Sequence, residues 1–200
     1  MTTVTRTSQF RQRQKKETYL MNPVKFTLWL FLVTVTMFFA AFTSAVVLRQ
    51  GAANWLYFKI PAAFTISTIT IVLSSITMQW AYYAAKKNEI AQNRIALWLT
   101  LILGTSFVIT QYLGFGQLIG ENVFLAGKAS NVAGSFFYVI VGLHALHVIG
   151  GVIFLIFTLV AAYQYKVHSK NLLRINLCTT YWHFIGGLWV YLFAFLTWIS

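Results

Sequence analysis

The sequence predicts an all-α membrane protein with five transmembrane helices. Of its 200 residues, 58% are hydrophobic and only 9% are charged, whereas soluble domains have about a quarter charged residues. Apolar runs longer than about 18 residues, the length that spans a bilayer as a helix, recur along the chain. The alternation typical of membrane strands does not compete with them. The five runs cover residues 26–48, 60–83, 95–118, 132–163 and 175–199.

Prolines and polar residues mark where the predicted helices begin. Asn22 precedes Pro23, and because a residue before proline avoids the helical region, the first helix should start there. Pro61 is expected in the first turn of the second helix, where its missing N–H costs nothing. Ser130 or Asn131 is expected to cap the fourth helix, whose 32 residues require tilt or extension past the bilayer.

The connections between these runs carry the polar and glycine-rich segments. Residues 88–93 are predicted to form a short polar loop, and residues 121–131 the longest loop on the other side. Gly114, Gly116 and Gly120 are predicted to loosen the end of the third helix.

The net charge of +12 is distributed in a way that indicates membrane topology and not a nucleic-acid partner. The positive-inside rule places the segments rich in Lys and Arg in the cytoplasm, so the N-terminus should be cytoplasmic and, with five spans, the C-terminus outside. We expect a basic cytoplasmic tail over residues 1–25 and a transmembrane domain over 26–200. The cytoplasmic basic residues are Arg6, Arg11, Arg13, Lys15, Lys16, Lys25, Lys86, Lys87, Arg94, Lys166, Lys170 and Arg174; Arg49, Lys59 and Lys128 lie on the other side.

Hydroxyl side chains form a stripe along one face of the second predicted helix, because they recur at spacings of three and four. In a membrane such a stripe usually packs against another helix, since small residues allow close approach. A polar permeation path is the alternative. The stripe consists of Ser67, Thr70, Ser74 and Thr77 and continues at Ala81.

Acidic residues are absent from every predicted span. The chain has no aspartate, and its glutamates, Glu17, Glu89 and Glu121, fall in the tail and the loops. Carboxylates dominate the proton relays of pumps and ion-coupled carriers. An independent pump or carrier is therefore not predicted. Paired carboxylates, a catalytic triad and a phosphate-binding glycine loop are also missing from the sequence, so an independent hydrolase or ATPase is not predicted either.

Three of the four histidines fall inside predicted spans: His144, His147 and His183, with His168 in a cytoplasmic loop. They could ligate haem, bind copper or iron, transfer protons, or bond to neighbouring helices. At 1.5 Å per residue, His183 should lie on the order of 10 Å inside the cytoplasmic edge and His147 about 16–24 Å. This difference in depth favours structural histidines over shared axial ligands.

Two motifs carry a family resemblance. "GSFFYVIVGLHALHVIGG", residues 134–151, resembles the signature of subunit three of haem–copper terminal oxidases, and "YWHF", residues 181–184, resembles the start of that family's last helix. "LSSITM" (73–78) and "LILGTSFVITQY" (101–112) also resemble family helices, and the resemblance covers nearly everything after residue 25. The matching positions are Gly134, Ser135, Phe137, Tyr138, Gly142, His144, His147, Val148, Gly151, Tyr181, Trp182, His183 and Trp189.

The resemblance implies the short, five-helix bacterial form of this subunit, a multi-pass protein of the bacterial cytoplasmic membrane. It implies no catalytic residue, cofactor site or metal site in this chain, because the haems and copper belong to the catalytic subunit I and to subunit II. The imidazoles would be hydrogen-bonding anchors within the bundle. The subunit would stabilise its catalytic partner, keep proton uptake working, and bind phospholipid in a helix cleft. The candidate lipid contacts are Arg94, Trp98 and Trp80.

The chain departs from the family pattern where acids are common. Gly186, Gly114 and Ala85 stand at or near those places, so no proton-linked carboxylate role is carried over. The same structural role in a quinol oxidase is the nearest alternative, and an independent b-type haem electron carrier is a more distant one. A fourth subunit and a larger respiratory supercomplex are further candidate partners.

Overall fold

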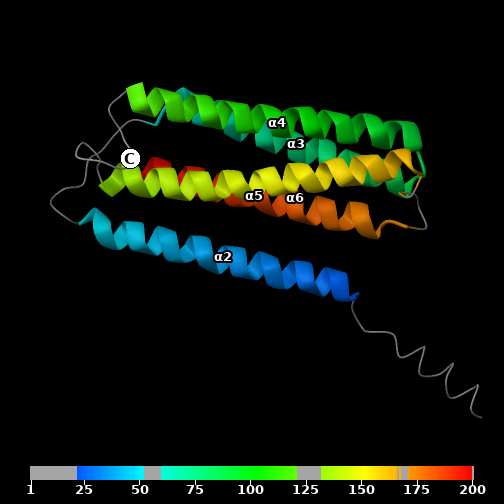
Figure 1. The fold of residues 1–200 in the computed structure, drawn as a ribbon, viewed down its shortest axis with the longest axis horizontal. Coiled ribbons are helices and arrows are strands. Elements are labelled where there is room, and N and C mark those ends of the chain that lie inside the picture. Colours follow the sequence, from blue (N-terminus) through cyan, green and yellow to red (C-terminus); the bar gives the residue numbers. More distant parts are fainter. Residues whose placement is uncertain (1–21, 52–59, 121–131, 166, 168–170, 200) are drawn as a thin grey trace, which may run out of the picture.

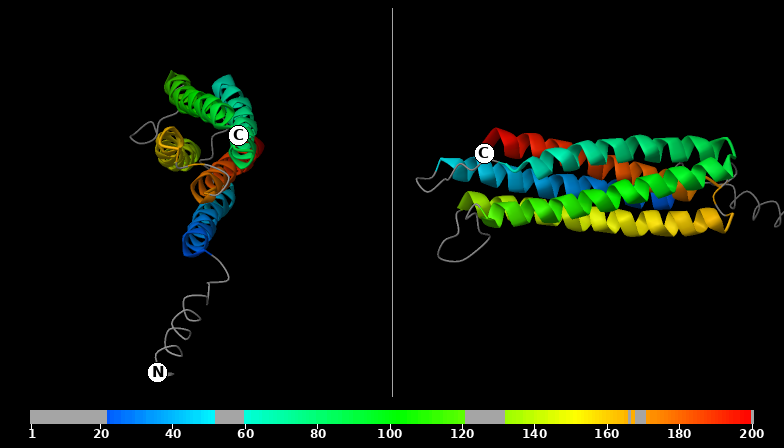
Figure 2. Two further views of the ribbon diagram at one scale, coloured as in Figure 1. Left: turned by 90° about the vertical axis from the view of Figure 1, so that its right-hand side faces the viewer. Right: turned by 90° about the horizontal axis from the view of Figure 1, so that it is seen from above.

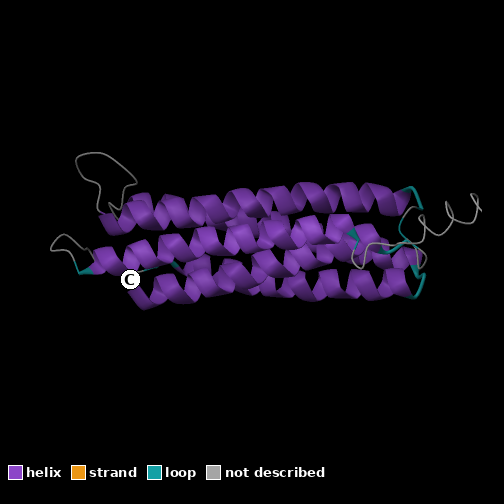
Figure 3. Ribbon diagram, turned by 90° about the horizontal axis from the view of Figure 1, so that it is seen from below, coloured by secondary structure: helices purple, strands orange, loops and turns teal. Residues whose placement is uncertain are grey.

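The computed structural model describes residues 22–51, 60–120, 132–165, 167 and 171–199. This part of the chain is almost entirely helical (Figures 1 and 3). Its five helices are α2 (Pro23–Gln50), α3 (Ala62–Lys86), α4 (Ile90–Gly120), α5 (Val132–Tyr163) and α6 (Leu173–Ile199).

All five helices of the described part are long and apolar enough to cross a membrane, which confirms the predicted fold class and number of spans. The bounds of α5 are those predicted, and α2, α4 and α6 extend past the apolar runs. Asn22 caps α2 by accepting a hydrogen bond from the Val24 backbone N–H at 3.1 Å, and Pro23 is the first helical residue. Residues 23–25 of the predicted tail are therefore helical, whereas residues 1–21 lie outside the described residues.

The second helix begins at Ala62, two positions after the start of the predicted run at residue 60. Pro61 is the cap of α3 and does not lie in its first turn. The predicted caps of the fourth helix, Ser130 and Asn131, lie outside the described residues, as do Lys59, Lys128 and His168.

The prediction that residues 88–93 form a loop is wrong from residue 90 onward. The chain turns at Asn88, which has a φ of 65°, and α4 begins at Ile90. Asn93 is buried in the first turns of α4 because its side-chain amide donates to the Ala81 carbonyl of α3 at 2.8 Å. A contact distant in sequence thus makes a polar segment helical.

The predicted loosening of the third span at its glycines is also wrong, since α4 continues through Gly114 and Gly116 to Gly120. At Gly114 an added Cβ would lie 2.7 Å from the ring of Phe64. This glycine therefore serves close packing of α4 on α3, and helical hydrogen bonding continues through it.

The helices alternate in direction (Figure 1), so the start of α2, the end of α3, the start of α4, the end of α5 and the start of α6 lie together. The described basic residues Lys25, Lys86, Lys87, Arg94 and Arg174 belong to this end, and Arg49 belongs to the other. This grouping agrees with the predicted charge distribution. The assignment of the basic end to the cytoplasm stays a prediction.

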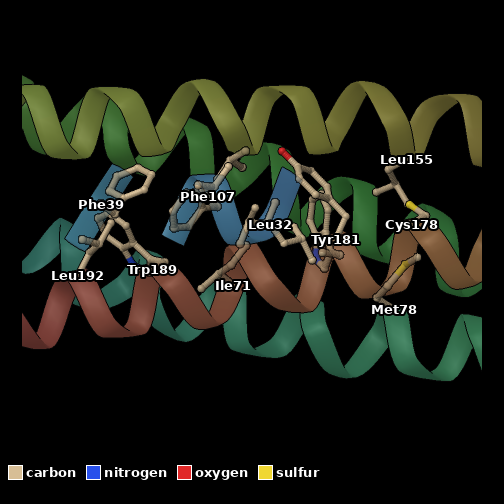
Figure 4. Packing of buried hydrophobic residues seen from close by; sticks show 14 of the residues in the cluster. Leu32, Phe39, Ile71, Met78, Phe107, Leu155, Cys178, Tyr181, Trp189 and Leu192 are labelled. Atoms are coloured by element: carbon tan, nitrogen blue, oxygen red, sulfur yellow. The ribbon is translucent and has the colours of Figure 1, made fainter. Parts of the chain in front are cut away.

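The last helix holds the bundle together. α6 contacts α2, α3 and α5, whereas α2 contacts only α5 and α6 among the described helices. The end view in Figure 2 shows α2 set apart from α3 and α4. Trp182 and Trp189 of α6 are completely buried, and Trp189 lies near Phe39 of α2 and Phe107 of α4 (Figure 4). Large aromatic rings from α6 thus fill the interior.

The hydroxyl stripe of α3 packs against other helices, which confirms the packing interpretation over a permeation path. Ser67, Ser74 and Ala81 are buried, and Thr70 bonds to the Ile66 carbonyl of its own helix. Three members of the stripe make bonds between helices: Ser67 accepts from Gln111 Nε2 at 2.7 Å, Ser74 accepts from Trp182 Nε1 at 3.0 Å, and Thr77 pairs with Thr100 at 2.8 Å.

Candidate functional site

The motif histidine His144 lies at the junction of four helices. Its side chain, on α5, is 0% exposed. The imidazole stacks on Trp189 of α6, with ring centroids 5.1 Å apart and planes at 30°. The edges of Phe39 from α2 and Phe107 from α4 approach the imidazole with centroids at 6.2 Å each.

Neither ring nitrogen of His144 has a hydrogen-bond partner among the described residues. A buried polar group without a partner costs about 1–3 kcal/mol, so the ring contacts must offset this cost. The expectation that this imidazole is a hydrogen-bonding anchor is wrong for His144. Its contribution within the chain is aromatic packing.

The second motif histidine, His147, joins helices mainly through its backbone. Its Nδ1 is 2.7 Å from the Leu143 carbonyl of its own helix, and its ring lies 5.7 Å from Phe39 of α2. Its carbonyl accepts a hydrogen bond at 2.9 Å from the hydroxyl of Tyr181 on α6. The bond between helices predicted for this motif exists, but the imidazole does not make it.

His183 is the motif histidine whose ring fulfils the predicted anchoring role. Its Nε2 lies 3.0 Å from Oε1 of Gln79, so the ring joins α6 to α3. The neighbouring Trp182 also bonds to α3, through Ser74. Trp189, about two turns further along α6, donates a hydrogen bond to the Thr68 hydroxyl of α3 at 2.9 Å. The "YWHF" segment and Trp189 therefore tie α6 to the polar face of α3.

The motif glycine Gly151 allows α5 and α6 to approach closely. A Cβ at Gly151 would lie 2.8 Å from Ile185 and 3.1 Å from Tyr181. Gly104 of α4 has the same role toward Trp182, at 2.6 Å. Gly142 differs, because an added Cβ there would meet nothing within 4 Å.

The remaining motif residues lie near the start of α5. Gly134 and Ser135 occupy its first turn. Tyr138 stacks on Phe115 of α4, with ring centroids 5.2 Å apart. These residues thus stand toward the other end of the bundle from the "YWHF" segment, and Tyr138 contributes to the contact of α5 with α4.

The three intramembrane imidazoles are directed at different neighbours. His183 faces Gln79 of α3, His147 faces α2, and His144 is enclosed by aromatic rings. Among the described residues no three His, Cys, Asp or Glu side chains lie close enough to hold a metal ion. The prediction that this chain holds no haem stays a prediction.

The positions where the family pattern would have acids are closely packed here. An added Cβ at Gly186 would lie 3.1 Å from the hydroxyl of Ser75, the space at Gly114 is filled by Phe64, and Ala85 is buried. A side chain at Gly114 would overlap the Phe64 ring, and one at Gly186 would require Ser75 to move.

Two of the three predicted lipid contacts, Arg94 and Trp98, lie together at the end of α5. Arg94 donates to the carbonyls of Ala162 and Tyr163 at the end of α5, at 3.3 and 3.5 Å. Its guanidinium also lies over the rings of Tyr163 and Tyr165, 4.7 and 4.8 Å from their centroids. Trp98 donates to the Tyr163 hydroxyl at 3.1 Å. Arg94 thus caps the C-terminal end of α5, where a cation is favoured.

The third predicted lipid contact lies apart from this cluster. Trp80 is on α3, and none of the bonds that join Arg94, Trp98 and Tyr163 involves it. Trp80 and Trp98 are 42% and 46% exposed, which is compatible with a position at the membrane interface.

Two grooves flank α2. The first, the α2–α5 groove, has a volume of about 540 Å³ and runs along Thr27, Leu28 and Phe31 of α2, with Phe154 of α5 and Leu177 of α6 on its other side. It continues into a hollow of about 410 Å³ lined by Phe154, Leu177, Asn171 and Arg174. The second, the α2–α6 groove, has a volume of about 440 Å³ and is lined by Thr36, Phe39, Ala40, His183, Phe184, Gly187, Leu188 and Tyr191.

Several residues that complete these contacts were not predicted from the sequence. Gln79, Gln111 and Thr68 each bond across helices. The available signal was that an amide inside an apolar run has to find a partner in the membrane. That signal indicates the need for a partner but does not identify it.

Comparison with known proteins gives one family. The family model described as cytochrome c oxidase subunit III matches residues 4–200. The chain is 31% identical over 163 residues to a probable cytochrome c oxidase subunit 3 of Nocardia farcinica, covering 79% of each chain. It is 31% identical over 170 residues to a cytochrome c oxidase subunit 3 of Alkalihalophilus pseudofirmus, covering 83% of this chain and 82% of that one. With the subunit 3 of Pelomedusa subrufa, it shares 31% identity over 70% of its own length and 51% of the relative's.

Proposed function

Because the chain belongs to the cytochrome c oxidase subunit III family, we propose that it is a non-catalytic, structural subunit of a proton-pumping haem–copper oxidase. It lies beside the haem-bearing catalytic subunit in a bacterial cytoplasmic membrane, with its N-terminus inside. Following the names of its relatives, the electron donor of the complex is cytochrome c. The haems and copper belong to the partner subunits.

One observation carries the structural role: the motif residues lie at contacts between helices. Trp182 and Trp189 bond to α3, Tyr181 bonds to α5, and Gly151 provides the close approach of α5 and α6. Side chains used in this way fix the shape of a surface. A fixed surface is what a partner subunit needs for stable association.

The test of this function is purification from native membranes in mild detergent through a tag on this chain. The expected result is co-purification of a haem-bearing subunit, while the chain expressed alone shows no Soret absorption. A Soret band in the isolated chain that disappears in the His183→Ala variant would support the haem carrier instead. If the sequence of the co-purified second subunit lacks copper-ligand cysteines, the complex is a quinol oxidase.

Phospholipid binding is the second part of the proposal, and the α2–α5 groove is its site. The groove is apolar along α2 and ends at Arg174, on the basic end of the bundle. An acyl chain fits beside Thr27, Leu28 and Phe31, while the phosphate pairs with the guanidinium of Arg174. Arg94, Trp98 and Trp80 contact further lipid at the same interface, through the exposed faces of the two tryptophans.

Replacing Arg174 with Gln tests the lipid site. A basic residue near an anionic membrane surface contributes about 1 kcal/mol, so affinity for phosphatidylglycerol should fall about fivefold. The measurement is lipid titration into the detergent-purified complex, followed by native mass spectrometry. Arg49→Gln, a charge removal at the opposite end of the bundle, is the matched control. Equal retention of lipid by both variants would contradict the assignment of Arg174.

A further inference from the structure

The α2–α6 groove lies halfway along the bundle and contains an unexplained glycine. An added Cβ at Gly187 would meet nothing within 4 Å, as at Gly116, Gly120 and Gly142, whereas Gly104, Gly114 and Gly151 are each closely packed; among the open glycines, Gly187 is the one that lines this groove. Glycine inside a helix costs about 0.5–1 kcal/mol relative to alanine. The contacts of the described chain therefore give no reason for glycine at position 187.

The groove is shaped for the approach of another backbone. Ala40 of α2 is a second small lining residue. In membranes, small residues on facing surfaces allow helices to come close enough for extensive van der Waals contact. The helix α2 is the least tightly packed of the described bundle, since its contacts with α5 and α6 are the sparsest between any two neighbouring helices. A helix placed in the groove would complete its packing.

The groove also contains hydrogen-bonding capacity that the chain does not use. Only Nε2 of His183 bonds within the described residues, to Gln79 Oε1. A neutral imidazole has one donor and one acceptor, and an amide has two donors and an acceptor. Whichever way the Gln79 amide is oriented, this pair retains a donor and an acceptor. Hydrocarbon tails cannot satisfy them, whereas a hydroxyl or amide side chain on an adjacent helix can.

We propose that the α2–α6 groove docks a transmembrane helix of the catalytic subunit. The helix presents small residues to Gly187 and Ala40 and a hydroxyl or amide side chain to His183. This inference rests on the proposed function, because it names the surface through which the subunit joins its partner. The proposal also assigns different ligands to the two sides of α2: the α2–α5 groove binds lipid, and the α2–α6 groove binds protein.

Photo-cross-linking in the intact oxidase tests the occupant directly. Phe184, which lines the groove, is replaced by p-benzoylphenylalanine in the full chain, and native membranes are irradiated. The expected product joins this chain to the haem-bearing subunit. The matched control is the same substitution at Tyr112, a 77% exposed aromatic residue of α4, which should give no such product. A cross-link from position 184 to phospholipid or to a second copy of this chain would overturn the proposal.

A pair of glycine variants tests the shape of the groove. Gly187→Leu should lower recovery of this chain with a tagged catalytic subunit at least tenfold. Gly116→Leu, at another exposed helical glycine with nothing within 4 Å, should leave recovery unchanged. Equal melting temperatures of the two purified variants establish that both fold. If Gly187→Leu is recovered as efficiently as the wild-type chain, the docking proposal alone is contradicted. If the wild-type chain itself does not co-purify with the catalytic subunit, the proposed function is contradicted.

Discussion

His144 contributes to the described bundle through the shape of its ring and not through hydrogen bonds of its nitrogen atoms. The ring is fully buried, has no hydrogen-bond partner among the described residues, and lies against aromatic rings from α2, α4 and α6. Its neighbour His147 lies one turn away and contributes its carbonyl, which accepts from Tyr181. Of the three intramembrane histidines, His183 alone makes a hydrogen bond from its ring to another described helix.

Replacing His144 with Phe should leave the melting temperature of the purified complex unchanged or raise it. Substituting an apolar ring of similar shape removes two unpaired polar atoms and keeps the stacking on Trp189. His144→Ala should destabilise by about 3–5 kcal/mol, because it leaves a cavity between four helices. Thermal unfolding monitored by intrinsic fluorescence compares the two. If Phe proves as damaging as Ala, the imidazole nitrogens have a partner and the packing account of His144 is wrong.

At the scale of the helices, two kinds of contact join α6 to α3, α4 and α5. Tryptophan indoles of α6 donate to hydroxyls of α3, and glycines of α4 and α5 let side chains of α6 approach their backbones. Both kinds of contact suit a membrane, where helices gain little from hydrophobic association and depend on close packing and hydrogen bonds.

Gly104→Ala should destabilise the bundle even though alanine favours helix. The new Cβ would lie 2.6 Å from the Trp182 ring, which is completely buried and cannot move away. Overpacking of this kind costs about 1–3 kcal/mol. Gly116→Ala, with no neighbour within 4 Å, is the control and should be neutral or stabilising. Matching melting curves for the two variants would show that α4 and α6 are not in close contact at Gly104.

A double-mutant cycle with Ser74→Ala and Trp182→Phe measures the bond between α3 and α6. Hydrogen bonds of this type in membrane proteins contribute about 0.6 kcal/mol on average and up to about 1.7. We expect a coupling energy in this range from unfolding in detergent. Strict additivity of the two single changes would mean that the indole does not donate to the Ser74 hydroxyl in solution.

The sequence predicts the helices better than their ends and partners. The bounds of the 132–163 span were predicted correctly because the run is strongly apolar and contains no charged residue. The start of α4 was missed because Asn93 and Arg94 look like loop residues, and only their contacts with Ala81 and with the end of α5 make them helical. The hydroxyl stripe predicted a packed face, but the pairing of Ser74 with Trp182 depends on which helix lies opposite, and that is tertiary information.

At the scale of the whole molecule, the described helices form a bundle with two unequal sides. The contacts among α3, α4, α5 and α6 are extensive, whereas α2 is held by two helices and leaves a groove toward each of them. One groove ends at Arg174 and the other contains His183. The proposed lipid and protein contacts thus both stabilise the position of α2, and the subunit's shape depends on its surroundings.

The most direct test of the scaffold role is oxygen consumption followed over many turnovers, with the oxidase purified with and without this chain. The account predicts the same initial rate for both enzymes and a faster loss of activity in the one that lacks the chain. Restoring the wild-type chain should restore the durability. An enzyme that lacks the chain yet keeps its activity as long as the complete one, or that loses its initial rate at once, would contradict the account.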